Sequence, residues 1–373
     1  MKSSKFTHPF VARFFFVAVF LLSLVVGITP VTAAPADGFG AVYTSTNASG
    51  GNEVLVFDRT SDGSLSLPKS YPTGGLGSGT SLGSQSAVVL SQNNHWLFVV
   101  NAGSNQISTY AVGAQGLSLA DVTDSGGIRP VSLTTYKDWL YVLNAGGSGN
   151  ITGFVIGQDG SLSPIANSTQ PLSNGGAGAA PGVGQIAFNS EGSALVVTEK
   201  STNSLDTYQV ADGVADAPVT HASAGAVPFG FAFDRHNHAI VSEAASGSVS
   251  SYKVADGGFS VISSAVVNSQ VAACWIAISN NGKFAYTTNA GSGTISSYQI
   301  AEDGSLTLLN AIAGSTGAGS APVDMAFSNN GSLLYTLGNA AHTITVFEMG
   351  ADGSLHNLGA VSVPASVAGL AAQ

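Results

Sequence analysis

Residues 140–154 of the chain, LYVLNAGGSGNITGF, decide the fold. A hydrophobic run ends in Asn144, a turn rich in Gly and Ser follows, and a second, alternating run covers residues 151–154. Short apolar or alternating runs bounded by glycine-rich turns are typical of β-strands paired in a hairpin. The stretch therefore predicts two antiparallel strands, and its recurrence tells how many such hairpins the chain contains.

The same pattern recurs along the chain in seven units. The residues that end the first strand of each hairpin are Asn47, Asn101, Asn144, Glu199, Glu243, Asn289 and Gly338, separated by 54, 43, 55, 44, 46 and 49 residues. The second strands cover residues 54–57, 107–110, 151–154, 205–208, 249–252, 295–298 and 344–347. A period of about 40 to 50 residues indicates radial repetition. We therefore expect seven structural units in a ring.

Two further strands complete each unit. One follows the sequence Asp-Gly-Ser-Leu at residues 62–65, 159–162, 303–306 and 352–355, where Asp-Gly suits the positive φ of a tight hairpin. The other precedes most units, as at residues 185–188, 230–233 and 324–327. Four antiparallel strands per unit form a propeller blade. The predicted fold class is all-β, a seven-bladed β-propeller with four-stranded antiparallel blades.

The two ends of the repeat array indicate how the ring closes. The first unit lacks its inner strand, because residues 37–40 leave no room for one. Residues 363–370 follow the last unit and imitate the inner strand at residues 227–233. We expect the C-terminal strand to join blade one as its innermost strand, which leaves no unpaired edge there.

The N-terminal residues predict export. The basic residues that precede an apolar run at 14–27 are Lys2, Lys5 and Arg13. This run is shorter than the roughly 20 residues that span a bilayer, and small residues follow it. The pattern predicts a signal peptide over residues 1–33, a propeller domain over residues 34–373, and secretion to the periplasm or outside the cell. A retained membrane anchor is the alternative.

Charge and composition limit the partners. Without the leader the chain has 8 basic and 21 acidic residues, a net charge of −13, which disfavours binding to nucleic acid. We expect a monomer that binds a small molecule, with no cofactor and no contact with a membrane once the leader is removed. The single cysteine, Cys274, excludes an internal disulfide and fits an inert core thiol. His236-Asn237-His238 has the spacing of metal ligands, but its position in a turn favours a solvated role, and no metal site is predicted.

These strand ends, Asp-Gly-Ser-Leu hairpins and unit lengths together resemble the seven-bladed lactonase family, which includes 6-phosphogluconolactonases and carboxymuconate cyclases. The resemblance covers essentially all of residues 34–373 and implies hydrolysis of a small cyclic ester. The family's enzymes are associated with Pro-Arg-His at the start of an inner strand and with a Glu beside the strand-end Asn. Here Arg129 has the family's spacing of fifteen residues before Asn144 but precedes Pro130, and no blade has the histidine.

The resemblance and the predicted geometry together select candidate site residues. Starts of inner strands and ends of second strands open on one face of a propeller, so residues from different blades gather there. The expected catalytic residues are Glu199 or Glu243 as the base and Arg129 as the oxyanion holder. The expected substrate-binding residues are Gln185, Asp324, Asn144 and Asn289. The alternative is a non-catalytic extracellular propeller that binds a small molecule, a glycan or a surface protein.

Overall fold

The computed structural model describes residues 1–5, 40–60, 62–255 and 257–373. The chain divides into two units, Met1–Thr32 and Ala33–Gln373. The expected signal peptide and its cleavage point lie outside the described residues, apart from residues 1–5, which have no regular structure. Within the described ranges, no helix is long and apolar enough to cross a membrane.

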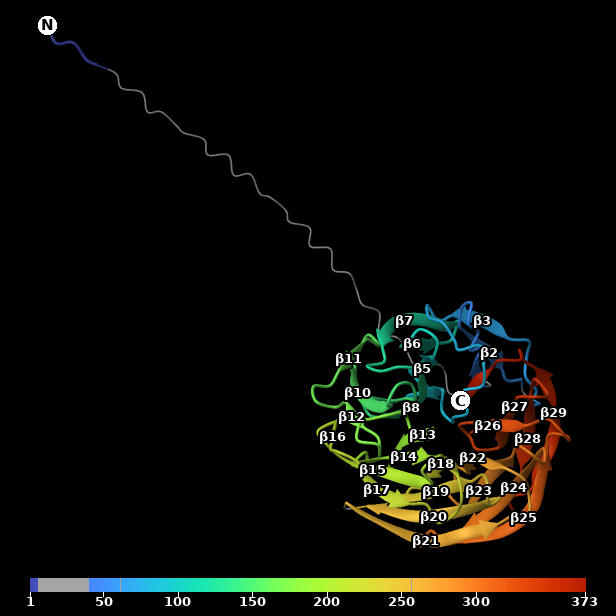
Figure 1. Cartoon of the computed structure of the whole chain (residues 1–373). Coiled ribbons are helices and arrows are strands. Elements are labelled where there is room, and N and C mark those ends of the chain that lie inside the picture. The colour runs from blue at the N-terminus through green and yellow to red at the C-terminus, as the bar shows by residue number, and fades with distance from the viewer. Residues whose placement is uncertain (6–39, 61, 256) are drawn as a thin grey trace. The chain divides into compact units, whose positions relative to one another are not determined.

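The second unit is a ring of seven antiparallel sheets, which Figure 1 shows in chain order around the centre. From the innermost strand outwards, blade 1 consists of β30 (Ala368–Ala372), β1 (Ala41–Ser45), β2 (Glu53–Asp58) and β3 (Lys69–Pro72), and blade 2 of β4 (Val88–Leu90), β5 (Trp96–Asn101), β6 (Gln106–Gly113) and β7 (Gly116–Asp124). Blade 3 consists of β8 (Pro130–Tyr136), β9 (Trp139–Asn144), β10 (Asn150–Ile156) and two short outer strands, β11 (Leu162–Pro164) and β12 (Gln170–Pro171). Blade 4 consists of β13 (Val183–Phe188), β14 (Ala194–Glu199), β15 (Ser204–Ala211), β16 (Val214–Ala215) and β17 (Val219–Ala222).

The last three blades follow the same plan with four strands each. Blade 5 consists of β18 (Pro228–Phe233), β19 (His238–Glu243), β20 (Ser248–Ala255) and β21 (Gly258–Val267). Blade 6 consists of β22 (Ala273–Ile278), β23 (Phe284–Asn289), β24 (Thr294–Ile300) and β25 (Leu306–Ser315), and blade 7 of β26 (Pro322–Phe327), β27 (Leu333–Gly338), β28 (Thr343–Met349) and β29 (Leu355–Ser362). The predicted all-β, seven-bladed propeller is confirmed.

Ring closure also follows the prediction. The C-terminal strand β30 pairs with β1 and forms the innermost strand of blade 1, with Tyr43 opposite Ala371 and Ser45 opposite Ala368. Thr44 Oγ1 donates to the carbonyl oxygen of Gly369 at 2.6 Å, where the register shifts. The two ends of the described propeller chain are thus joined within one sheet.

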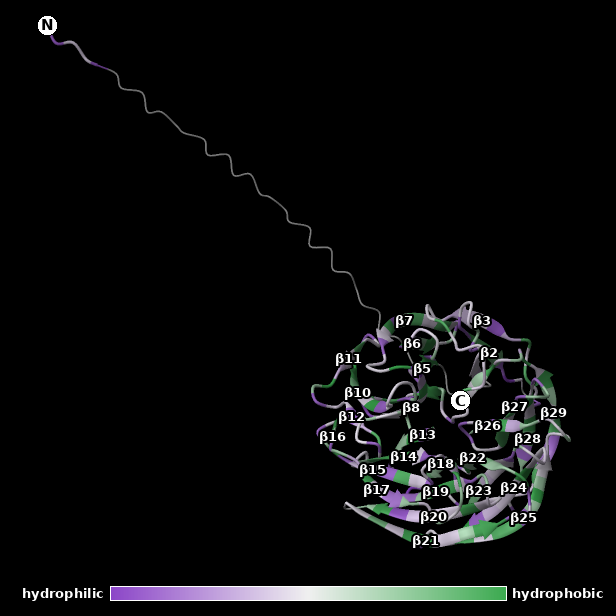
Figure 2. Cartoon of the chain, in the orientation of Figure 1, coloured by the Kyte–Doolittle hydropathy of each residue, from purple (hydrophilic) through white to green (hydrophobic). Residues whose placement is uncertain are grey.

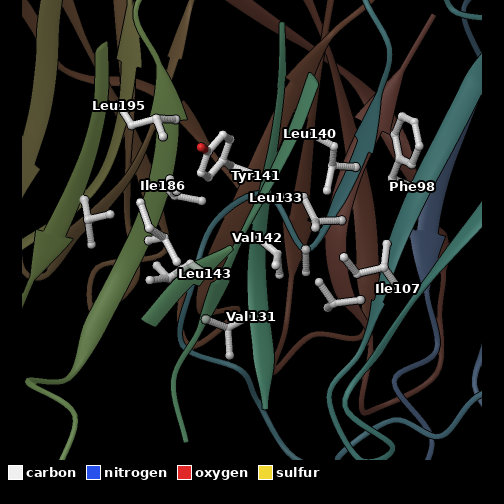
Figure 3. Close-up of a cluster of buried hydrophobic side chains, with 14 of the residues drawn as sticks. Phe98, Ile107, Val131, Leu133, Leu140, Tyr141, Val142, Leu143, Ile186 and Leu195 are labelled. Carbon is white, nitrogen blue, oxygen red and sulfur yellow. The ribbon is translucent and has the colours of Figure 1, made fainter. Parts of the chain in front are cut away.

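The hydrophobic core lies between neighbouring blades. Alternate residues of each strand point to opposite faces of a sheet, so every blade packs one apolar face against each neighbour. Figure 3 shows this for blades 2, 3 and 4, where Phe98, Leu140 and Ile186 lie in one buried cluster. Tyr141 is fully buried, and its hydroxyl donates to the carbonyl oxygen of Gly213 in blade 4 at 2.8 Å.

The outer strands face solvent on one side. Strand β21 carries both hydrophobic and hydrophilic positions, none of them fully buried (Figure 2). The Asp-Gly turns lead into these strands as predicted. In blade 3, for example, Gly160 has a φ of 84°, and Asp159 Oδ1 accepts hydrogen bonds from the backbone N–H and the hydroxyl of Ser161. The turn closes through its own side chains.

Candidate functional site

Residues 84–86, which end one residue before β4, occupy the axis of the ring. Their hydrogen bonds reach four other blades: Ser84 Oγ to Val131 O at 2.8 Å, Gln85 N to Gly184 O at 3.2 Å, Gln85 Nε2 to Ile276 O at 2.7 Å, and Ser86 N to Asp324 Oδ2 at 3.3 Å. The backbone N–H of Ile276 in turn donates to Gln85 Oε1 at 3.2 Å. One short segment can bond blades 3, 4, 6 and 7 only from the centre. We call residues 84–86 the axial segment.

Two of the predicted substrate-binding residues meet at this segment. Gln185 and Asp324 hold equivalent positions, two residues into the inner strands β13 and β26, and both contact Ser86. Gln185 Oε1 also accepts a hydrogen bond from Phe231 N at 2.7 Å, while Asp324 Oδ2 accepts one from Leu370 N at 3.1 Å. Both side chains are buried. Their partners belong to the protein itself, so here they tie inner strands together.

The carboxyl group of Asp324 has an unusual environment. Burial raises its pKa to about 7, against three backbone N–H donors, from Ser86, Met325 and Leu370, that lower it. A carboxylate taken out of water favours its neutral form unless donors compensate. Asp324 therefore joins the ring-closing strand β30 to blade 7 and to the axial segment through a group that titrates near neutral pH.

A lysine that directly follows β14 lies beside the axial segment. Lys200 Nζ donates to the carbonyl oxygen of Gly83 at 2.6 Å and lies 4.4 Å from the ring centroid of Phe229, at the start of β18. Burial and, to a smaller extent, the positive charge of Arg129 lower the pKa of Lys200 to about 8. An amine with a pKa in this range is partly neutral at mildly alkaline pH, so it can accept a proton from water.

Aromatic and thiol groups border the lysine. The rings of Phe229 and Trp275 are 4.7 Å apart and tilted by 53°, and Trp275 Nε1 donates to the carbonyl oxygen of Ser84 at 3.1 Å. Cys274 is buried next to Trp275, and burial raises the pKa of its thiol to about 12. The thiol therefore stays protonated at neutral pH. An apolar, aromatic border beside a cation suits a small ring with a polar carbonyl group.

The strand-end residues of blades 2 to 6 share one structural task. Each is fully buried and hydrogen-bonds a residue of the chain that arrives from the preceding blade. The pairs are Asn101 with Thr73, Asn144 with Ser125, Glu199 with Ser173, Glu243 with Ser223 and Asn289 with Asn268. We call these five residues the strand-end clamps. Glu199 and Glu243 thus occupy positions where the other three blades have asparagine.

The carboxylates of the two glutamates are supplied with donors by the protein. Glu199 accepts hydrogen bonds from Ser173 N at 3.0 Å and Thr202 Oγ1 at 2.7 Å, and Glu243 accepts them from Ser223 Oγ at 2.9 Å and Tyr252 Oη at 3.1 Å. Burial raises the pKa of Glu243, against these donors. Both glutamates have a relative exposure of 0%. Neither carboxylate is therefore exposed to bulk solvent.

Glu199 has a second buried acid beside it. Asp206, on the neighbouring strand β15, accepts a hydrogen bond from Thr220 Oγ1 at 2.6 Å. Burial and the Glu199 carboxyl group together raise the pKa of Asp206 to about 7. Two carboxyl groups this close cannot both be charged without cost, so the pair holds a proton well above the pH at which a free aspartate loses it.

Arg129 stands apart from both glutamates. It precedes β8 as an exposed residue with a φ of 57°, and its backbone N–H donates to Asn105 Oδ1 at 2.8 Å. The ion pairs found among the described residues join Lys69 to Asp58 and two histidines to Asp234, so Arg129 lies within 4.0 Å of neither Glu199 nor Glu243. Of the three expected catalytic residues, Arg129 is the one whose charge acts on Lys200.

Sequence reasoning missed Lys200 and the axial segment. Lys200 stands one position beyond the strand end and is one of five lysines after residue 33, a scarcity that could have drawn attention to it. Ser86 falls at the predicted start of an inner strand, but the glycine-rich linker before it gives no sequence signal that residues 84–86 cross the axis. The structure brings together Gln185 and Asp324 at Ser86, and it leaves Asn144 and Asn289 in separate clamps.

Comparison with known proteins identifies the family. The family model for the seven-bladed β-propeller lactonases matches residues 43–174 and 258–369, so the chain belongs to this family. No curated protein sequence matches the chain. The resemblance inferred from the strand ends and hairpins is confirmed.

Solved structures share the fold at low sequence identity. The periplasmic gluconolactonase of Pseudomonas aeruginosa is 19% identical, with a TM-score of 0.69 over 89% of this chain and 98% of that one. A Bacteroides fragilis protein provisionally assigned as a 6-phosphogluconolactonase is 19% identical, with a TM-score of 0.68 over 91% and 99%. A Desulfotomaculum acetoxidans protein of unknown function is 14% identical, with a TM-score of 0.70 over 89% and 98%.

Proposed function

We propose that this protein hydrolyses a small cyclic ester at the centre of the ring, on the face where Lys200 and Arg129 lie. Membership of the lactonase family supports the reaction class. The single observation that carries the location is the half-buried Lys200 amine, which lies between Gly83, next to the axial segment, and Phe229 and has a pKa of about 8.

The proposed reaction uses the two basic residues in different roles. The neutral Lys200 amine takes a proton from water as the water oxygen attacks the lactone carbonyl carbon. The Arg129 guanidinium stabilises the negative charge that develops on the carbonyl oxygen. When the ring C–O bond breaks, the Lys200 ammonium returns the proton to the departing alkoxide. One lactone and one water give one hydroxy acid, and the amine is regenerated.

The site properties also suggest the substrate class. The tilted rings of Phe229 and Trp275 offer an apolar face, and Lys200 and Arg129 supply positive charge beside it. A sugar-type lactone presents a ring with apolar C–H groups and releases a carboxylate, which both cations attract. We further propose that residues 34–373 act as a monomer outside the cytoplasm, because the N-terminal sequence has the pattern of an export signal.

Glu199 and Glu243 enter this proposal as strand-end clamps. Their burial and their donors from the protein favour that role. A Gln in place of either glutamate has a carbonyl oxygen that accepts hydrogen bonds and an NH₂ group that donates them. These are the same groups as in the asparagine clamps. Such variants should keep their turnover number if the glutamates only clamp, and should lose it if one of them is the base.

A pH-indicator assay with a panel of lactones tests the proposal. The purified protein should acidify the medium with at least one lactone, and Lys200→Met should reduce kcat/KM at least about 100-fold, as expected for loss of a general base. Lys253→Met, which removes an exposed lysine of β20, is the matched control and should be unaffected. No turnover with any lactone would refute the proposal and favour the non-catalytic binding alternative.

A further inference from the structure

The turn between β18 and β19 brings three metal-binding side chains together, at the end of blade 5 opposite to Glu243. Asp234 Oδ2 lies 2.8 Å from Nδ1 of His238 and 3.9 Å from Nδ1 of His236. One ligand atom from each of the three residues lies within 4.8 Å of the other two. The turn therefore already gathers two imidazoles and a carboxylate.

The equivalent turns of other blades are built differently. In blades 2, 6 and 7 the turn is closed by a serine hydroxyl that donates to an asparagine side chain two residues later. The pairs are Ser91 with Asn93, Ser279 with Asn281 and Ser328 with Asn330, each at 2.7 Å. In blade 5, Asp234 Oδ1 alone accepts the backbone N–H groups of His236 at 2.8 Å and His238 at 2.9 Å. Asp234 Oδ2 and both imidazoles are not needed to close the turn.

The position of His238 is fixed by the neighbouring blade. His238 is buried, with a relative exposure of 5%, so its interpretation as part of a solvated turn was wrong, while His236 is exposed as expected. Gly304 of blade 6 has a φ of 82°, and a Cβ built there would lie 2.6 Å from Cγ of the His238 ring. The backbone of Gly304 thus packs directly on the imidazole. A ring held in this way loses little conformational freedom when it binds a ligand.

We propose that Asp234, His236 and His238 bind a divalent transition-metal ion of the zinc type. Zinc binds imidazole nitrogen and carboxylate oxygen at about 2.0–2.2 Å, which in a tetrahedral site separates neighbouring ligand atoms by about 3.4 Å. The two distances from Asp234 Oδ2, 2.8 Å and 3.9 Å, bracket this value. A small rotation of the exposed His236 side chain would shorten its 3.9 Å distance from Asp234 Oδ2. The 2.8 Å distance between His238 and Asp234 would lengthen as the ion replaces their hydrogen bond.

An adjacent pocket supplies access and the remaining ligand. It has a volume of about 290 Å³ and is lined by Asp234, Arg235 and His236 of blade 5 and by turns of blade 6 that include Lys283 and Glu302. Three protein ligands leave a fourth tetrahedral position, which water from this pocket can fill. The site lies at the opposite end of β19 from the strand-end clamp Glu243, so it is separate from the proposed lactone site.

The test is Zn²⁺ binding by untagged protein after removal of metal with a chelator. Isothermal titration should give one Zn²⁺ per chain, and Co²⁺ should give visible absorption bands typical of nitrogen and oxygen ligands. His236→Ala is the primary variant because this exposed imidazole forms no hydrogen bond with another described residue, so the fold should be retained. It should weaken Zn²⁺ binding at least tenfold, whereas His236→Cys, which restores a zinc ligand, should recover most of the affinity.

His95→Ala is the matched control. His95 lies in the equivalent turn of blade 2, directly before Trp96, which holds the strand position of His238, and Asn93 follows Ser91 by two residues as His236 follows Asp234. Its removal should leave the titration unchanged. The proposal is overturned if the protein binds no Zn²⁺ or Co²⁺, or if His236→Ala binds Zn²⁺ as tightly as the parent protein while circular dichroism shows an intact fold.

Discussion

Removal of the last ten residues, 364–373, should destabilise the whole propeller, because β30 is the inner strand of blade 1. The deleted segment buries Val367, Ala368, Leu370 and Ala371, whose relative exposures are 3%, 8%, 4% and 8%. Burial of a Val or Leu side chain contributes about 1.5–3 kcal/mol and each alanine methyl about 0.8 kcal/mol, which gives roughly 5–8 kcal/mol. This is comparable with the entire stability of a typical domain, about 5–15 kcal/mol.

Thermal unfolding followed by circular dichroism measures the effect. An unfolding entropy of about 2.1 cal/mol/K per residue gives roughly 0.7 kcal/mol/K for this domain, so the loss corresponds to a drop in Tm on the order of 10 °C. If the truncated chain does not fold, Leu370→Ala replaces it. That substitution should cost about 2–5 kcal/mol, or roughly 3–7 °C.

Leu358→Ala provides the matched control, because Leu358 lies on the outer strand β29 and is 40% exposed. It should shift Tm by only about 1 °C, since surface substitutions usually change stability by less than about 0.5 kcal/mol. A truncated protein with the Tm of the parent chain, or equal shifts for Leu370→Ala and Leu358→Ala, would refute ring closure by β30.

Three further predictions concern the centre of the ring and its packing. The lactonase kcat/KM should rise with pH through about 8 as Lys200 loses its proton, and Lys200→Arg should abolish that rise; an unchanged pH profile in the variant would contradict a base role. The raised pKa of Asp206 means that the folded protein keeps a proton which the unfolded chain loses between about pH 4 and 7, so the unfolding free energy should fall as pH rises through this window. Urea titrations at pH 4 and 8 should show a smaller fall in Asp206→Asn, with exposed Asp216→Asn as the control that keeps the parent slope. Gly77→Ala should lower Tm by several degrees because its Cβ would lie 2.0 Å from the carbonyl carbon of Asn47, whereas Gly50→Ala, with open space around it, should not; equal Tm values for the two variants would contradict the close approach.

The repeat pattern made the fold predictable. The strands that end in Asn144 and Glu199 can be recognised from their own apolar residues, and the Asp-Gly turns mark where the outer strands begin. Both signals lie within a few residues of the strand that they predict. Ring closure was also predictable, because the C-terminal residues imitate an inner strand that the first unit lacks. The tail pairs as Ala368–Ala372, later than the run at residues 363–370 indicated, because residues 365 and 366 form a turn before the strand.

The site was less predictable because the roles of its side chains depend on distant partners. The strand-end positions of Glu199 and Glu243 were right, but their contacts with Ser173 and Ser223 come from linkers 26 and 20 residues upstream, which no spacing rule describes. Burial against Gly83 and Phe229 lowers the pKa of Lys200. These two residues belong to distant parts of the chain, and no local sequence pattern connects them with Lys200.

The axial segment has a consequence for how solutes can move. Gln85 hydrogen-bonds Ile276 in both directions, and Ser86 is held by Gln185 and Asp324, so the axial segment crosses the middle of the ring. Under the proposed function, substrate and product would therefore enter and leave on the same face of the ring, beside Lys200.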